Sequence, residues 1–293
     1  MSENEITIGK AERGKVPAFR IKWLRRLYQG DVGPVAAQPS AQATPAVEQK
    51  RKKTATPIKI TSPYIIKFTE EDAPLTEEYR KLKSVVLMMM KQNAKQNTLV
   101  VTSSESGEGK SLTAVNLALV LAQESNRTVL LVDGDLRRPA LHTYLGVKPD
   151  FGLADCILDR VDLHDALIKT TVPRLNFLAA GKRTDAPAEL LSSDRMKEFM
   201  QEIKNRYHDR IIIFDTPPTL IFTDIRVLSP FADGILFVVK EGVAANSVRD
   251  ALAVLKGSPV LGIVYNGASP EQLNGRYHRY YRYYNRKQQD NNT

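Results

Sequence analysis

One stretch of small, glycine-rich residues has the composition of a phosphate-binding loop. Residues 104–111 read Ser-Glu-Ser-Gly-Glu-Gly-Lys-Ser; an apolar run ending at Val101 precedes them, and residues 112–124 have apolar side chains at helical spacing. Glycines let backbone N–H groups turn toward an anion, and a helix N-terminus attracts negative charge. Lys110 can reach the terminal phosphates of a nucleotide, and the Ser111 hydroxyl can bind Mg²⁺. We therefore expect a nucleotide site in this segment, which we call the phosphate loop.

The phosphate loop departs from the usual G-x-x-x-x-G-K-[ST] pattern at its first position, where the residue is Ser104. A short structural loop without a ligand is the alternative interpretation, but the strand–loop–helix context favours a nucleotide site. The first group of residues expected to contact the nucleotide lies in the loop or at the start of the following helix. They are Ser106, Gly107, Glu108, Gly109, Lys110, Ser111 and Leu112.

Two further apolar runs end in a carboxylate. Residues 128–133 end at Asp133, which is followed by Gly-Asp-Leu-Arg, and residues 210–215 end at Asp215. Ligands of open parallel sheets bind at the carboxyl ends of the strands, so both acids are expected beside the phosphates. Each acid could instead cap the next helix. Two such strand ends in one chain with the phosphate loop favour Mg²⁺ binding by Ser111, Asp133 and Asp215.

Length and composition limit the class of protein. The 293 residues carry a formal charge of +9, which is enough chain for one large α/β domain with tails. The single cysteine excludes an internal disulfide and fits a reducing compartment. No apolar run is long enough to span a bilayer, and the N-terminus lacks the apolar core of a secretory signal. These features predict a cytoplasmic protein.

Strands that alternate with helices predict an α/β fold with a mostly parallel central sheet and helices on both faces. We expect helices over 74–91 and 187–207, among others. We place the folded domain at residues 60–272. A polar, Pro- and Ala-rich extension over 1–59 and a tail over 273–293 are expected to be disordered.

The extension contains a segment with apolar and basic residues. On a helical wheel, residues 16–29 place Phe19, Trp23 and Leu27 on one side and Lys22 and Arg26 on the other. This pattern predicts an amphipathic helix that docks on a membrane or a partner. The alternative is a short helix packed against the main domain.

The tail is rich in tyrosine and arginine. Five of the eleven tyrosines lie close together, at Tyr277, Tyr280, Tyr281, Tyr283 and Tyr284. The tail has no apolar period that could build a core. Two interpretations stay open at this point: phosphorylatable phenols, or aromatic and basic side chains that bind single-stranded nucleic acid. A solvated tail without a role is the third.

Together, these motifs resemble the bacterial tyrosine kinases of exopolysaccharide and capsule systems, which are P-loop enzymes related to the MinD and ParA ATPases. The phosphate loop, the strand ending in Asp133-x-Asp135-x-Arg137, the strand ending at Asp215 and the tyrosine-rich tail match that family in order. The resemblance covers roughly residues 60–287. It implies an ATP- and Mg²⁺-dependent tyrosine autokinase that phosphorylates its own tail and regulates exopolysaccharide synthesis, with no nucleic acid expected as a partner.

The resemblance also implies roles for single residues. Lys110, Asp133, Asp135, Arg137 and Asp215 are the candidate catalytic residues, with Asp133 preferred as the base. Related ATPases place an asparagine on adenine, and the matching position is Asn266. The family forms rings through an E-x-x-R-x-x-R helix, which is matched by Glu77, Arg80 and Lys83, with lysine in place of the last arginine.

Partners follow from the same resemblance. It implies a separate transmembrane polysaccharide co-polymerase that activates the kinase at the inner face of the plasma membrane, and a tyrosine phosphatase.

MinD and ParA relatives carry an extra lysine early in the loop, where this chain has Glu105, and this difference argues against that branch. Two other functions stay open: a positioning ATPase whose basic tail binds DNA or membrane, and a nucleotide-dependent scaffold that has lost phosphate transfer.

Overall fold

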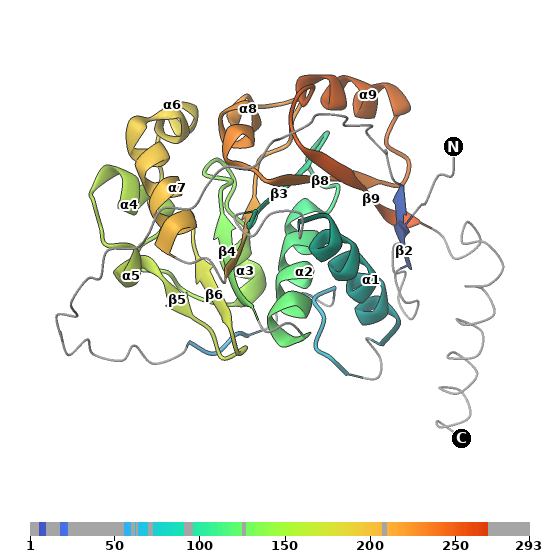
Figure 1. Cartoon of the computed structure of the whole chain (residues 1–293), viewed down its shortest axis with the longest axis horizontal. Coiled ribbons are helices and arrows are strands. Elements are labelled where there is room, and N and C mark those ends of the chain that lie inside the picture. Colours follow the sequence, from blue (N-terminus) through green and yellow to red (C-terminus); the bar gives the residue numbers. More distant parts are fainter. Residues whose placement is uncertain are drawn as a thin grey trace, which may run out of the picture.

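A computed structural model describes residues 6–9, 18–22, 56–59, 62, 64–69, 73–90, 96–124, 127–206 and 210–268. Its centre is a twisted, mostly parallel β-sheet with helices on both faces (Figure 1), as the sequence predicted. The phosphoacceptor candidates of the tail, Tyr277, Tyr280, Tyr281, Tyr283 and Tyr284, lie outside the described residues.

The strands of the described part form a nine-stranded sheet in the order β1-β2-β9-β8-β3-β7-β4-β6-β5. Neighbouring strands from β9 to β6 pair in parallel, whereas β5 runs antiparallel to β6. Parallel pairing brings the carboxyl ends of these strands to one edge, which is where the candidate residues lie. The bounds are β1 Ile6–Gly9, β2 Ala18–Lys22, β3 Thr98–Ser103, β4 Thr128–Asp133, β5 Ile168–Lys169, β6 Leu175–Leu178, β7 Arg210–Asp215, β8 Gly234–Lys240 and β9 Val260–Ala268.

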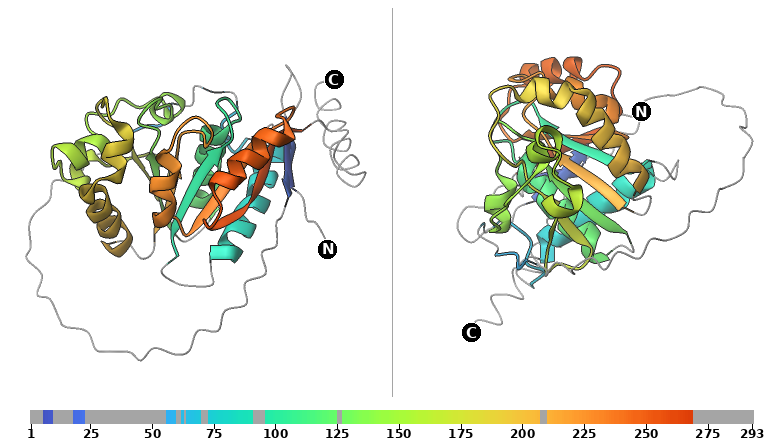
Figure 2. Two further views of the ribbon diagram at one scale, coloured as in Figure 1. Left: turned by 90° about the horizontal axis from the view of Figure 1, so that it is seen from above. Right: turned by 90° about the vertical axis from the view of Figure 1, so that its left-hand side faces the viewer.

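Helices cover the sheet in two layers, each with its own apolar core. One core joins α1, α2 and α3 to alternate residues of the strands, such as Val101 and Leu131, and the other joins α4 to α9 to the residues between them, such as Val100 and Leu130. Figure 2 shows the two helical layers on opposite faces. The helices are α1 Ala73–Met90, α2 Lys110–Glu124, α3 Leu141–Leu145, α4 Leu153–Leu158, α5 Leu163–Ala166, α6 Pro187–Ser192, α7 Asp194–Arg206, α8 Asp224–Leu228 and α9 Ala245–Val254, with a 3₁₀ turn at Ser229–Phe231.

The helix expected over 187–207 is two helices, α6 and α7, separated by Ser193. Ser193 has extended backbone angles, with φ −64° and ψ 155°. Its Oγ accepts a hydrogen bond from the backbone N–H of Met196 (3.1 Å), so the serine ends one helix and caps the next. Continuous apolar spacing could not reveal this break.

The N-terminal extension contacts the domain earlier than expected. The Thr56 N–H donates to the Lys169 carbonyl (2.6 Å), and the Thr171 N–H donates to the Thr56 carbonyl (3.0 Å). Thr56 therefore continues the sheet beyond β5 as an isolated parallel bridge to Thr170. Thr56 thus pairs with the sheet just before the boundary predicted at residue 60, and the domain bounds themselves stay a prediction.

The prediction of an amphipathic helix over 16–29 is wrong for the residues of that segment that the structure describes. Ala18–Lys22 is strand β2, which pairs antiparallel with β9. Without a partner on that side, β9 would leave its backbone N–H and C=O groups unpaired, and the backbone of Ala18–Lys22 pairs with them. The alternation of apolar and basic residues in this segment is typical of a strand. The rest of the predicted helix lies outside the described residues.

No helix in the described part of the chain combines the length and the apolar composition needed to cross a bilayer.

Candidate nucleotide site

The phosphate loop connects the end of β3 to the first residue of α2, as its sequence predicted. Gly107 and Gly109 have φ values of +83° and +93°, a conformation that residues with a Cβ rarely adopt. Helix α2 starts directly at Lys110. The first N–H groups of a helix have no intrahelical acceptor, so those of α2 are available to an anion held by the loop. Ser106 and Gly107 are exposed at the tip, and Leu112 is half-buried against the core.

Lys110 lies between two carboxylates at the strand ends. Its Nζ is 3.1 Å from Asp135 Oδ2 and 3.6 Å from Asp215 Oδ1. It also lies 3.3 Å from Ser111 Oγ. Burial alone would lower the pKa of Lys110, but the charges of Asp215 and Asp135 outweigh this effect and raise it. Lys110 therefore keeps its positive charge at the point where phosphates would lie.

Asp133 and Asp215 are fully buried and only partly satisfied. Asp133 Oδ2 accepts hydrogen bonds from the N–H groups of Ala140 and Leu141, both at 3.1 Å. Asp133 Oδ1 and both oxygens of Asp215 have no hydrogen-bond partner among the described residues. Burial, with the charge of Asp215, raises the pKa of Asp133 to about 8. Burial also raises the pKa of Asp215 to about 6, although Lys110 limits the rise.

Unpartnered buried carboxylate oxygens beside a serine hydroxyl fit a bound cation. Buried polar atoms are normally hydrogen-bonded, yet these three oxygens accept no hydrogen bond within the described residues, and only Asp215 Oδ1 has an ion-pair contact there, with Lys110 Nζ at 3.6 Å. Mg²⁺ prefers oxygen ligands and completes its coordination with phosphates and water. Ser111, Asp133 and Asp215 are therefore the residues of this chain that would hold it.

Comparisons with known proteins agree with this geometry. Residues 96–255 match the family model described as AAA domain. The chain is 35% identical over 227 residues to tyrosine-protein kinase YwqD of Bacillus subtilis, covering 76% of this chain and 92% of YwqD. It is 34% identical over 202 residues to tyrosine-protein kinase CpsD of Streptococcus agalactiae serotype Ia, covering 67% of this chain and 84% of CpsD. The chain belongs to the bacterial tyrosine kinases.

Solved structures of this kinase family have the same fold. The crystal structure of the chimerical protein CapA2B2 covers 72% of this chain and 92% of its own, with a TM-score of 0.65 and 29% identity. The kinase domain of the Escherichia coli tyrosine kinase ETK covers 71% of this chain and 82% of its own, with a TM-score of 0.63 and 27% identity. The motifs identified in the sequence therefore occupy a bacterial tyrosine kinase domain.

In this kinase, Arg137 is engaged away from the phosphate loop. Its guanidinium binds both oxygens of the buried Asp224, with Nε at 2.8 Å and Nη2 at 3.1 Å. It also lies over the Phe222 ring, 4.3 Å from the centroid. The side chain thus ties the loop after β4 to the loop after β7. These contacts support a role for Arg137 in ordering the loop, and its predicted catalytic role stays a prediction.

Replacing Arg137 with alanine should destabilise the kinase by about 2–3 kcal/mol, because Asp224 would remain buried without its partner. Urea unfolding measures the loss. Arg138→Ala, at the exposed neighbouring position, is the matched control and should change stability by less than about 0.5 kcal/mol. The double variant Arg137→Ala/Asp224→Ala should recover part of the loss. Equal unfolding midpoints for Arg137→Ala and the parent would contradict the role assigned to this ion pair.

Asn266 lies at the end of β9, next to the phosphate loop. Its Nδ2 donates to the Glu108 carbonyl (2.8 Å). A Cβ added at Gly109 would lie 2.0 Å from the same Nδ2, so the loop glycine and the asparagine are packed together. The predicted contact with adenine stays a prediction, and the contact that the structure adds is one with the loop backbone.

Two residues of the site, Gly134 and Asp224, were missed in the sequence, and the buried position of the Glu108 side chain was not predicted. Gly134 donates its N–H to the Asp215 carbonyl (2.8 Å), and a Cβ there would lie 2.9 Å from that oxygen, so glycine lets β4 and β7 approach. The position of Gly134 between two candidate site residues, Asp133 and Asp135, could have indicated that it belongs to the site. Asp224 and the inward-facing side chain of Glu108 had no signal, because neither spacing nor residue type shows which acids are buried.

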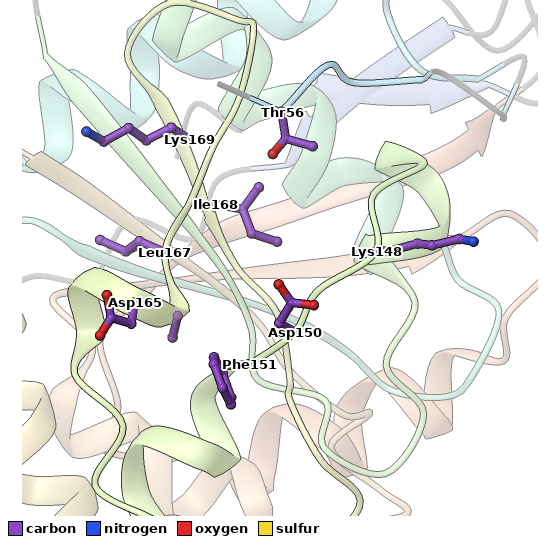
Figure 3. Close-up of a pocket in the computed structure, with 9 residues that line it drawn as sticks. Thr56, Lys148, Asp150, Phe151, Asp165, Leu167, Ile168 and Lys169 are labelled. Atoms are coloured by element: carbon purple, nitrogen blue, oxygen red, sulfur yellow. The ribbon is translucent and has the colours of Figure 1, made fainter. Parts of the chain in front are cut away.

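A hollow lies away from the phosphate loop, beside β5, which is the end strand of the sheet. It has a volume of about 230 Å³, and its lining includes Thr56, Asp150, Phe151 and Ile168. Figure 3 shows that Lys148 and Lys169 point away from each other, so no single charge is concentrated there. None of its lining residues belongs to the phosphate loop or its carboxylates, and we assign it no ligand.

Proposed function

We propose that this protein is an ATP-dependent protein-tyrosine autokinase that phosphorylates the tyrosines of its own tail. The observation that carries the proposal is the convergence of Lys110, Asp135 and Asp215 beside a phosphate loop. The identity of this chain to tyrosine-protein kinases over two thirds or more of its length supports the choice of acceptor.

The residues divide the work of phosphoryl transfer, which depends mainly on positioning and charge neutralisation. Lys110 and the first N–H groups of α2 bind the phosphates of ATP. Ser111, Asp133 and Asp215 hold Mg²⁺, which neutralises charge on the phosphates when it is bound. Arg137 keeps the two strand-end loops in place through Asp224.

Asp133 is the preferred base for the tyrosine hydroxyl, with Asp135 second. A phenol has a pKa near 10, so it needs an acceptor for its proton. Asp133 Oδ1 is unpartnered, whereas Asp135 is occupied by Lys110 and by the N–H of Arg138 (3.0 Å).

Strand β9, the last described segment before the tail, ends at the sheet edge where the nucleotide is proposed to bind. Strand β9 runs parallel to β8 and ends at Ala268. From Asn266 to Tyr277, an extended chain covers at most about 35 Å. The acceptors at Tyr277, Tyr280, Tyr281, Tyr283 and Tyr284 can therefore reach a nucleotide site, and we propose that they reach the site of a neighbouring subunit in a ring.

The proposed setting is exopolysaccharide synthesis or export. The family resemblance supports a separate transmembrane co-polymerase that recruits the kinase to the inner face of the plasma membrane, and a tyrosine phosphatase that reverses the reaction. In this setting, phosphorylation of the tail regulates assembly of the polysaccharide machinery.

The ring interface is proposed on α1, at Glu77, Arg80 and Lys83. Within the chain, Arg80 Nη1 lies 3.4 Å from Glu77 Oε2, and both side chains are more than 40% exposed. Such exposed pairs contribute only about 0.3–0.5 kcal/mol to a helix. Both side chains are therefore exposed enough to contact another subunit.

Changing Glu77 and Arg80 together to alanine should shift the protein toward monomer and lower tail phosphorylation, with almost no change in unfolding midpoint. Light scattering measures the mass. The matched control is Asp194→Ala/Lys197→Ala, which removes a similar exposed i,i+3 pair from α7. An equal mass for the parent and the Glu77/Arg80 variant would contradict the proposed interface.

A mixing experiment tests the proposed function. Lys110→Arg protein supplies acceptor tails, and a chain without residues 273–293 supplies active sites. Phosphotyrosine on the Lys110→Arg chain, formed only in the mixture with MgATP, is the expected result. ATP hydrolysis without phosphotyrosine would favour the positioning ATPase, and nucleotide binding without either reaction would favour the scaffold.

A further inference from the structure

The phosphate loop contains a glutamate whose side chain faces the protein interior. Glu108 is only 2% exposed, whereas Glu105 in the same loop is exposed. Glu108 Oε1 accepts a hydrogen bond from Ser104 Oγ (2.6 Å) and another from the Glu105 N–H. The carboxylate of Glu108 thus holds residues 104 and 105, at the start of the loop, close to residue 108.

The second carboxylate oxygen connects the loop to a different strand. Glu108 Oε2 accepts a hydrogen bond from the backbone N–H of Lys240, the last residue of β8 (3.1 Å). The carbonyl of Glu108 accepts from Asn266 Nδ2 on β9 (2.8 Å). One residue therefore fixes the loop to the ends of both strands on that side of β3.

These contacts explain the departure at the first motif position. Ser104, in place of the usual glycine, is fully buried, and its hydroxyl is a donor to Glu108. A glycine could not supply this hydrogen bond. The serine and the glutamate therefore work as a pair, and the sequence feature that looked like a defect is part of the loop's support.

We propose that Glu108 is a positioning residue that holds the phosphate loop in its phosphate-binding shape, with Ser104 as its partner. A loop that is already ordered loses less entropy when the nucleotide binds, which increases affinity. The inference rests on the nucleotide site of the proposed function but not on transfer to tyrosine.

The direction in which nucleotide affinity changes when Glu108 is removed separates a positioning role from a purely electrostatic one. A negative charge in the loop repels the phosphates of a nucleotide, so removing it should tighten binding if charge were its main effect. If Glu108 positions the loop, its removal should weaken binding, because three hydrogen-bond donors lose their acceptor. Glu105 has the same charge in the same loop, but its side chain is exposed, so it shows the charge effect by itself.

Calorimetry with MgADP tests the proposal on the full chain. We expect Glu108→Ala to raise the Kd for MgADP by about tenfold or more, because hydrogen bonds to a buried charged acceptor are lost. Glu105→Ala should leave the Kd unchanged or lower it. Glu108→Gln keeps an oxygen for Ser104 and the Glu105 N–H but cannot accept fully from Lys240, so it should lie between Glu108→Ala and the parent.

Ser104→Ala provides a milder variant if Glu108→Ala does not fold. It removes one hydrogen bond, and it should weaken MgADP binding in the parent but have a smaller effect in the Glu108→Gln background. A parent-like or tighter Kd for folded Glu108→Ala, or for Ser104→Ala if the first variant is unfolded, would overturn the proposal. Weakened MgADP binding in the variants, together with no phosphotyrosine in the parent, would support this inference and contradict the proposed kinase function.

Discussion

Replacing Asp215 with asparagine is expected to stabilise the nucleotide-free protein and to remove its response to magnesium nucleotide. Both oxygens of Asp215 are buried without hydrogen-bond partners, so a neutral amide at this position avoids the cost of a buried charge. The same change removes a carboxylate from the proposed Mg²⁺ site. MgADP should therefore raise the melting temperature of the parent much more than that of the variant.

The pH dependence of this effect has a definite sign. The folded-state pKa of Asp215 is raised from 3.8 to about 6, so the unfolded state releases this proton more easily. Asp215 therefore lowers stability increasingly as pH rises from about 4 to about 6, and the cost is complete above that range. At pH 8 the variant should be more stable than the parent by on the order of 2 kcal/mol, since Lys110 also loses a neighbouring charge.

Urea unfolding of nucleotide-free protein at pH 8 and pH 5 measures this difference, which should shrink at the lower pH. Asp194→Asn is the matched control, because Asp194 is a fully exposed acid on α7 whose pKa is lowered by Lys197. It should lack the gain in stability at pH 8. An Asp215→Asn protein that is less stable than the parent at pH 8, yet still stabilised by MgADP, would contradict the assignment.

Lys110→Met is expected to abolish tail phosphorylation, with a fall in rate of about 10³-fold or more. Lys110 is the cation nearest the expected phosphates, and a positioned charge at a transferring phosphoryl group contributes several kcal/mol to the transition state. The rate of tail phosphorylation is measured by following phosphotyrosine over time, with radiolabelled ATP or by mass spectrometry.

Lys110→Arg separates chemistry from folding. Lys110→Met leaves the buried Asp135 without the cation that lies 3.1 Å away, so it should also destabilise the fold. Arginine keeps the positive charge but presents it as a planar fork in place of a compact ammonium group, which cannot reach the phosphates in the same way. Parent-like stability with greatly reduced phosphorylation is expected for Lys110→Arg. Undiminished phosphorylation in both variants would contradict the role of Lys110.

Much of the site could be predicted because it depends on short, local patterns. Apolar runs ending at Val101, Asp133 and Asp215 predicted parallel strands, and parallel pairing alone brings their ends together. The Gly-Lys-Ser sequence predicted where α2 starts. These inferences required no knowledge of distant contacts.

The features that were wrong or missed depend on contacts between distant segments. The segment Ala18–Lys22 has helical and alternating apolar patterns at once, and pairing with the distant strand β9 selects the strand. Arg137 could have faced the phosphates, but the buried carboxylate of Asp224, far along the chain, binds it instead. Glu108 is a charged residue in a glycine-rich loop, a context that usually leaves a side chain exposed. Its side chain is buried because it accepts hydrogen bonds from groups that include the N–H of Lys240, far along the chain.

Site-resolved mass spectrometry of the tail tests the central claim most directly. Purified protein is stripped with a tyrosine phosphatase, freed of the phosphatase and incubated with MgATP, beside Lys110→Arg protein treated in the same way. The proposed function predicts new phosphate in the parent alone, on one or more of Tyr277, Tyr280, Tyr281, Tyr283 and Tyr284. Consumption of ATP by the parent with no phosphate on any of these tyrosines would contradict it.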